Sequence, residues 1–184
     1  MRILSLRIEQ FRSYERAELA FPDAGLVLLV GPNGSGKTNV VEALSYLSTG
    51  RSCLGVAHEH AMRWGTEFFR VRVQVRRDSG EEQSIEFVSQ MTPKRERAAF
   101  VNDVRISFVQ FVGRLPTIIF LPQDLDLFTG GPQRRRGFLD AIISQLQPDF
   151  LTARLEYERI LKQRNALLKR IADGLASPAD LDPW

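Results

Sequence analysis

The stretch GPNGSGKT, residues 31–38, follows directly on the apolar run LVLLV and constrains the fold more than any other feature of the chain. The run at 26–30 has no polar gap, so it predicts a buried strand, central in a sheet. After the loop, apolar residues recur at helical spacing, at Val40, Ala43, Leu44 and Leu47. A glycine-rich loop between a buried strand and a helix is the setting of a phosphate-binding loop.

The residue types of this loop fit the binding of a nucleoside triphosphate. Its three glycines let the backbone adopt left-handed angles, so that its N–H groups can surround phosphate oxygens. The start of the helix adds partial positive charge. Lys37 can reach the β- and γ-phosphates, and Thr38 can offer its hydroxyl to Mg²⁺. The predicted contact set is Gly31, Pro32, Asn33, Gly34, Ser35, Gly36, Lys37 and Thr38.

Composition limits the other possibilities. The 184 residues fall within the usual range for one domain, and 43% of them are hydrophobic, enough for a sizeable core. Cys53 is the single cysteine, which excludes an internal disulfide and fits a reducing cytoplasm. No stretch resembles a signal peptide or is long enough to span a membrane. The net charge of +3 permits a nucleic-acid partner without demonstrating one.

Alternating apolar and polar residues predict a β-rich portion around the loop. Two strands precede it, one hairpin turns at 78–80 and another turns at 102–103, and TIIF predicts a short buried strand at 117–120. The expected fold class is therefore α/β with α+β character, with mixed and antiparallel strands. Strands are expected at 4–8, 17–21, 71–75, 84–88, 98–101 and 104–106.

The last third is predicted to be helical, with Pro132 and Pro148 each opening a helix. In the second helix, apolar residues from 150 to 171 are spaced alternately three and four apart, interrupted at Arg164. This spacing fits a helical arm and, equally, an ordinary amphipathic helix on a core. We expect a nucleotide-binding lobe over 1–128 and a helical segment over 129–184 that begins a second lobe or arm.

The sequence contains no recognisable catalytic carboxylate, so no catalytic residue is assigned. Hydrolysis requires a metal-binding aspartate at the end of a second buried strand. IIFLPQD is the nearest match, but Pro122 and Gln123 intervene. FTGGPQRRR at 128–136 is interpreted as a loop entering a helix rather than an ABC-type signature, because Pro132 splits its glycine from its glutamine.

Other charged clusters leave two interpretations open. His58 and His60 flank Glu59, which could suggest a metal site, but solvated loop residues are favoured because no third ligand is evident. The arginines at 134–136 could bind phosphate or DNA, or could be a solvated helix start. The basic loop TPKRERAAF has the same ambiguity.

Four segments together resemble a known family over nearly the whole chain. They are FRSY, GPNGSGKTNVVEALSYLSTGRS, FLPQDLDLFTGGPQRRRGFLD and YERILKQRNALLK, in that order. The chain resembles the N-terminal half of the RecF family of bacterial recombination mediator ATPases. The third and fourth segments are far more specific than the loop, which many families share.

The resemblance implies an ABC-type ATPase head related to SMC and Rad-type heads. In such proteins ATP and Mg²⁺ lie between two heads of a homodimer. Family members bind DNA at single-strand gaps and double-strand junctions, and act with RecO and RecR in recombinase loading, gap repair and replication-fork recovery. The resemblance also places Arg12 and Ser13 near the base or ribose, and Gln123 and Asp124 in the loop that senses the γ-phosphate and metal.

The chain departs from the family pattern in two places and lacks two motifs. Family members often carry asparagine at the position of Ser13, and an aromatic residue and an arginine where Cys53 and Leu54 stand. The signature motif and the catalytic strand lie further along in the family. We therefore expect a fragment that binds ATP without hydrolysing it. A small-molecule kinase or transferase, or a non-catalytic interaction module, are the alternatives.

Overall fold

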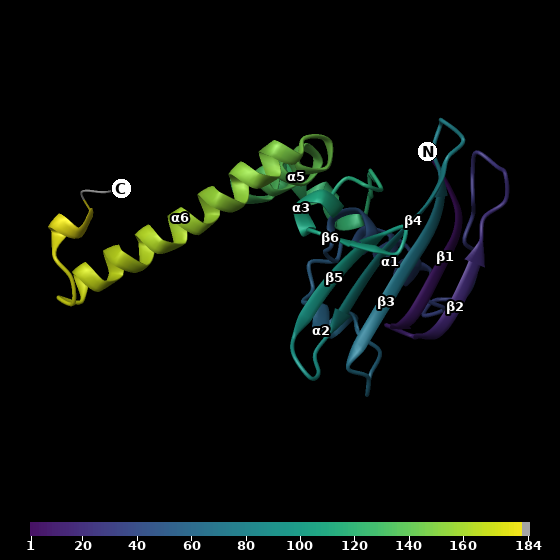
Figure 1. The fold of residues 1–184 in the computed structure, drawn as a ribbon, viewed down its shortest axis with the longest axis horizontal. Helices are drawn as coiled ribbons and strands as arrows, with labels where there is room; N and C mark the ends of the chain where they lie inside the picture. Colours follow the sequence, from purple (N-terminus) through teal and green to yellow (C-terminus); the bar gives the residue numbers. More distant parts are fainter. Residues whose placement is uncertain (182–184) are drawn as a thin grey trace.

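The computed structural model describes residues 1–181 and shows a sheet with helices on one side and a projecting helical arm (Figure 1). The elements in chain order are β1 (Arg2–Phe11), β2 (Tyr14–Ala20), α1 (Lys37–Thr49), α2 (His58–Ala61), β3 (Phe68–Arg76), β4 (Glu82–Gln90), β5 (Glu96–Val101), β6 (Val104–Ile106), α3 (Phe108–Phe111), the 3₁₀ turn η1 (Pro122–Leu125), α4 (Asp126–Thr129), α5 (Pro132–Leu146), α6 (Pro148–Ala172) and η2 (Pro178–Leu181).

The six strands form one sheet in the order β2-β1-β3-β4-β5-β6, and every neighbouring pair is antiparallel. The predicted strand pairs are confirmed, with Val71 opposite Phe87 in the central pair. The turn between β5 and β6 uses Asn102 and Asp103 at φ values of 50° and 62°. Such left-handed angles match the twist of a hairpin and suit these two residue types.

Side chains alternate between the two faces of the sheet, as the strand period of two requires. On the face against α1, an aromatic cluster forms the centre of the core. Phe87 lies 5.5 Å from Tyr46 and 6.0 Å from Phe69, between ring centroids. All three side chains are fully buried. The opposite face of β3 carries arginines in ion pairs, among them Arg72 with Asp103 at 2.6 Å.

The helical end of the chain forms an arm. α5 packs against the start of α6, and α6 then leads away from the sheet (Figure 1). Along it Tyr157 is 63% exposed and Ile160 is 39% exposed. Of the two interpretations of the apolar seam, the arm is therefore the one that the structure supports. Within residues 1–181, the helices are too short or too polar to cross a lipid bilayer.

Two predicted strands are wrong. Residues 26–30 and 117–120 lie outside the sheet and form no regular secondary structure. Most of their apolar side chains are exposed, Leu28 by 78% and Ile118 by 86%, whereas Ile119 is half-buried. A buried strand needs partners on both sides and cover on both faces. Residues 1–181 supply no strand that pairs with either segment, so neither forms a strand.

Candidate nucleotide-binding site

The glycine loop enters the first turn of α1 directly, as predicted. Gly34 and Gly36 take φ values of 81° and 94°, which only glycine adopts without strain. Gly36 is the N-cap of α1 and has no side chain to occupy the N–H groups of the first turn. Those groups have no partners within the helix. The loop therefore presents an uncapped helix start to an anion.

Lys37 and Thr38 stand at the mouth of this loop. The Lys37 Nζ donates to the carbonyl oxygens of Gly31 at 2.8 Å and Pro32 at 2.7 Å. A lysine ammonium has three donors, so one is left over for a phosphate oxygen. Thr38 is exposed in the first turn of α1. The structure thus brings together the residues predicted to hold the phosphates and the metal.

The turn between β1 and β2 lies along the start of α1. The Tyr14 hydroxyl donates to the Gly36 carbonyl at 3.3 Å, and the Asn39 amide donates to the Ser13 Oγ at 3.0 Å. A β-carbon at Gly36 would fall against the Tyr14 ring. Ser13 is therefore close to the start of α1, and its hydroxyl accepts a hydrogen bond from the helix. Its predicted contact with the base or ribose stays a prediction.

Arg12 is held in a network that sequence reasoning missed. Its Nε and Nη2 donate to the two carboxylate oxygens of Glu42, each at 2.7 Å, and its Nη1 donates to the His60 carbonyl at 2.8 Å. Glu42 is fully buried and also accepts from the Ser52 hydroxyl at 2.5 Å. The hydrogen bonds to Glu42 raise the pKa of Arg12. The sequence carried one signal of this network, since Glu42 places a carboxylate on the apolar face of α1.

Gln123 and Asp124 lie in η1, and within residues 1–181 no hydrogen bond or ion pair joins either side chain to the glycine loop. Gln123 is exposed. The Asp124 carboxylate accepts from the Leu121 N–H at 2.7 Å, and so caps its own turn. Residues 1–181 contain no group of three or more histidine, cysteine, aspartate or glutamate side chains that could hold a metal ion. The predicted role of Gln123 stays a prediction.

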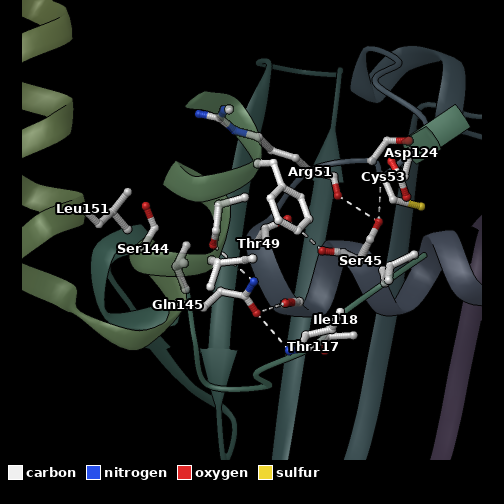
Figure 2. Close-up of a pocket in the computed structure, with 18 of the residues that line it drawn as sticks. Ser45, Thr49, Arg51, Cys53, Thr117, Ile118, Asp124, Ser144, Gln145 and Leu151 are labelled. Carbon is white, nitrogen blue, oxygen red and sulfur yellow. Dashed lines mark hydrogen bonds between the residues drawn. The ribbon is translucent and has the colours of Figure 1, made fainter. Parts of the chain in front are cut away.

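A cavity of about 360 Å³ opens at the far end of α1, next to α5 and the extended segment 117–121 (Figure 2). Gln145 of α5 links α1 to the segment at 117, because its Oε1 accepts hydrogen bonds from the Ser48 hydroxyl at 2.7 Å and from the Thr117 N–H at 2.9 Å. α1 has 13 residues, so its two ends lie about 20 Å apart. The cavity is therefore separate from the phosphate loop.

Of the two histidines, His58 differs from the favoured solvated interpretation and His60 agrees with it. His58 opens the short helix α2, and its ring stacks on Phe87 at 5.9 Å and contacts Tyr46 at 5.4 Å. Burial, followed by the charge of Arg97, lowers the pKa of His58. His58 is thus part of the rim of the core, whereas His60 is exposed.

The stretch at 128–136 leads through a short loop into α5, as predicted, and its arginines lie in the first turns of that helix. Gly131 is the N-cap of α5 and Pro132 occupies its first turn. Arg134 pairs with Asp126 at 2.6 Å, and Arg135 donates to the Gly130 carbonyl at 3.0 Å. The Arg134 side chain remains 59% exposed. Both open interpretations, a phosphate contact and a solvated helix start, agree with this geometry.

Comparison with known proteins agrees with the fold and with the loop. A family model described as an AAA domain matches residues 5–173. DNA replication and repair protein RecF of Streptomyces avermitilis is 40% identical over 173 residues, which are 94% of this chain and 45% of that protein. RecF of Leptospira interrogans serovar Lai is 38% identical over 89% of this chain and 45% of its own length. The chain spans about half the length of the curated relatives it matches.

Solved structures give the same result. A structure of the recombination mediator protein RecF-ATPrS in the RecFOR pathway is 32% identical, covers 97% of this chain and 48% of its own, and superposes with a TM-score of 0.89. An SMC ATPase structure at 21% identity and a TM-score of 0.62, covering 77% of this chain and 99% of its own, shares the fold. The predicted fold class and family resemblance are confirmed. The chain belongs to the AAA domain family, and its relatives within that family are RecF proteins.

Proposed function

We propose that this chain is the ATP-binding N-terminal part of a RecF-type recombination mediator that acts in DNA gap repair and replication-fork recovery. The observation that carries the proposal is the glycine loop leading into a helix start without a side-chain cap, with Lys37 and Thr38 in the first turn of that helix. The similarity to RecF proteins over nearly the whole chain supports it. The cofactors are ATP and Mg²⁺, and the place of action is the bacterial cytoplasm, where DNA repair occurs.

The complete protein is proposed to be an ATPase, and this chain to bind ATP without turning it over. Phosphoryl transfer depends on positioning and on charge stabilisation by a metal and its carboxylate. Among the acids of the described chain, Glu42 is paired with Arg12, Asp126 is paired with Arg134, and Asp124 caps its own turn. We infer that the rest of the protein supplies the catalytic acid, the signature motif and the strands that would pair with 26–30 and 117–120.

The two parts of the chain are proposed to have different functions. Residues 1–128 would form the nucleotide-binding lobe, with Gly31 to Thr38 on the phosphates and Ser13 beside the start of α1. Gln123 is proposed to reach the γ-phosphate in the complete protein. Residues 129–184 begin a second lobe or arm. Two complete heads would close on ATP as a homodimer, and RecO and RecR are the proposed protein partners.

Thr38→Val tests the magnesium contact. Valine keeps the shape of threonine but loses the hydroxyl oxygen, the kind of ligand that Mg²⁺ requires. We expect ATP affinity without magnesium to stay the same and the enhancement by magnesium to shrink several-fold. Calorimetric titrations with and without Mg²⁺ measure both. An equal enhancement in the variant and the unaltered chain would exclude Thr38 as a ligand.

DNA binding by the start of α5 is tested with salt. Arginines that touch phosphates release counterions, so affinity falls as salt rises. We expect Arg134→Ala with Arg135→Ala to reduce the slope of log affinity against log salt by about one to two for a gapped duplex. Arg70→Ala with Arg76→Ala on β3 removes the same two positive charges and serves as the matched control. An unchanged slope in the double variant would mean that these arginines only stabilise the helix start.

A further inference from the structure

The turn between β1 and β2 contacts one face of α1 at regular intervals. Tyr14, Ser13 and Arg12 reach helix positions 36, 39 and 42, respectively. Positions three apart lie on the same side of a helix. Three consecutive residues, two in the turn and the first of β2, therefore run along the first two turns of the helix that begins at the phosphate loop.

All three guanidinium nitrogens of Arg12 are hydrogen-bonded within the protein. Each of its three nitrogens donates to a protein oxygen, at 2.7–2.8 Å, and the side chain is only 23% exposed. Glu42 is 0% exposed. If the Arg12 side chain moved away, the buried Glu42 carboxylate would lose its countercharge, which is strongly unfavourable. Arg12 is therefore not free to turn toward a nucleotide.

Four segments meet at the Arg12–Glu42 pair. Arg12 brings the β1–β2 turn, the His60 carbonyl brings α2, and Ser52 brings the loop that follows α1. Glu42 itself lies in the second turn of α1, five residues after Lys37. The network thus fixes the start of α1 against the sheet from outside the helix. The N-cap Gly36 has no side chain with which to do so.

We propose that Arg12 and Glu42 act as a positioning pair, which holds the N–H groups of the phosphate loop in place, and that Arg12 does not contact the base or ribose. The inference rests on the proposed nucleotide binding. A site that is rigid before the ligand arrives loses less entropy on binding. Without the pair, the start of α1 can shift relative to the sheet, and the phosphates are bound less well whatever base they carry.

The test compares ATP with inorganic tripolyphosphate, which has no base or ribose. Calorimetry is run on the unaltered chain, Arg12→Ala, Glu42→Gln and the double variant, below their unfolding temperatures. We expect each single variant to bind both ligands about tenfold more weakly, and the double variant to bind no worse than the weaker single. Such non-additivity is typical of residues that act as one unit.

A matched control removes an ion pair that lies outside the site. Arg76 and Glu82 pair at 2.6 Å on β3 and β4 and are 47% and 48% exposed. Arg76→Ala and Glu82→Ala should leave both affinities unchanged. A pair that only stabilised the fold would lower the unfolding temperature and leave the affinity of the folded protein intact, and that outcome for Arg12 and Glu42 would overturn the proposal.

Two other results would also overturn it. Loss of ATP affinity without loss of tripolyphosphate affinity in Arg12→Ala would show a direct base or ribose contact. An unchanged or higher ATP affinity in Glu42→Gln would show that Arg12 works alone.

If Arg12→Ala does not fold, Arg12→Lys replaces it, since lysine keeps the charge but loses the two-point contact. That variant should bind tripolyphosphate several-fold more weakly, and equal binding would contradict the proposal. No binding of either ligand by the unaltered chain would instead refute nucleotide binding itself.

Discussion

Lys37→Ala is expected to weaken ATP binding at least tenfold, or by about 1.4 kcal/mol. The Lys37 ammonium lies against the loop carbonyls of Gly31 and Pro32, with one donor left for the phosphates. Removing it takes away the positive charge that faces the β- and γ-phosphates. Calorimetric titration with ATP measures the loss, and circular dichroism checks that the variant is folded.

Lys162→Ala is the matched control for this prediction. Lys162 is an exposed lysine of α6, so its removal changes the net charge equally and leaves the loop intact. Its ATP affinity should equal that of the unaltered chain. If Lys37→Ala bound ATP as tightly as this control, the phosphate-loop assignment would fail.

Phe87→Ala is expected to lower the free energy of unfolding by about 3–5 kcal/mol. Phe87 is fully buried and contacts Tyr46, Phe69 and Phe111, with ring centroids 5.5, 6.0 and 6.0 Å away. The substitution leaves a cavity between the sheet and α1. Because domains of this size are stable by only about 5–15 kcal/mol, this loss is a large fraction of the total. Urea denaturation measures it.

Phe68→Ala on the neighbouring strand is the control. Phe68 is the same residue type but is 39% exposed. We expect a loss of about 1 kcal/mol or less, as for most substitutions at the surface. Equal losses for the two variants would contradict the placement of the core on the α1 face of the sheet.

Much of the fold could be predicted from the sequence because its determinants are local. Alternation of apolar residues identified β1, β3 and β4, and Asn102 with Asp103 identified a hairpin turn. Pro132 and Pro148 marked the starts of α5 and α6. The same holds for the phosphate loop, whose conformation follows from its own glycines and from the helix that it enters.

The two wrong strands depended on residues far away in the chain. The apolar runs at 26–30 and 117–120 have the composition of buried strands, but composition does not supply a partner. A strand is stable only when another strand accepts its hydrogen bonds. Residues 1–181 pair neither segment, and the chain spans about half the length of its curated relatives.

The network around Glu42 could not be predicted for a related reason. Arg12 and Glu42 are 30 residues apart, and nothing local signals that the β1–β2 turn lies along α1. The family resemblance placed Arg12 near the base or ribose from its position in FRSY. Only the three-dimensional structure shows its nitrogens directed at Glu42 and His60. In the same way, the aromatic surroundings of His58 depend on strands that are distant in sequence.

The central claim is that ATP binds at residues 31–38, and amide chemical-shift mapping by NMR tests it most directly. The account predicts that Mg²⁺–ATP produces its largest shifts at the glycines of the loop, Lys37 and Thr38, and that tripolyphosphate shifts the same amides. The amide resonances of residues that line the cavity at the other end of α1 should shift little. Shifts centred on that cavity, or none in the loop at saturating ATP, would contradict the account.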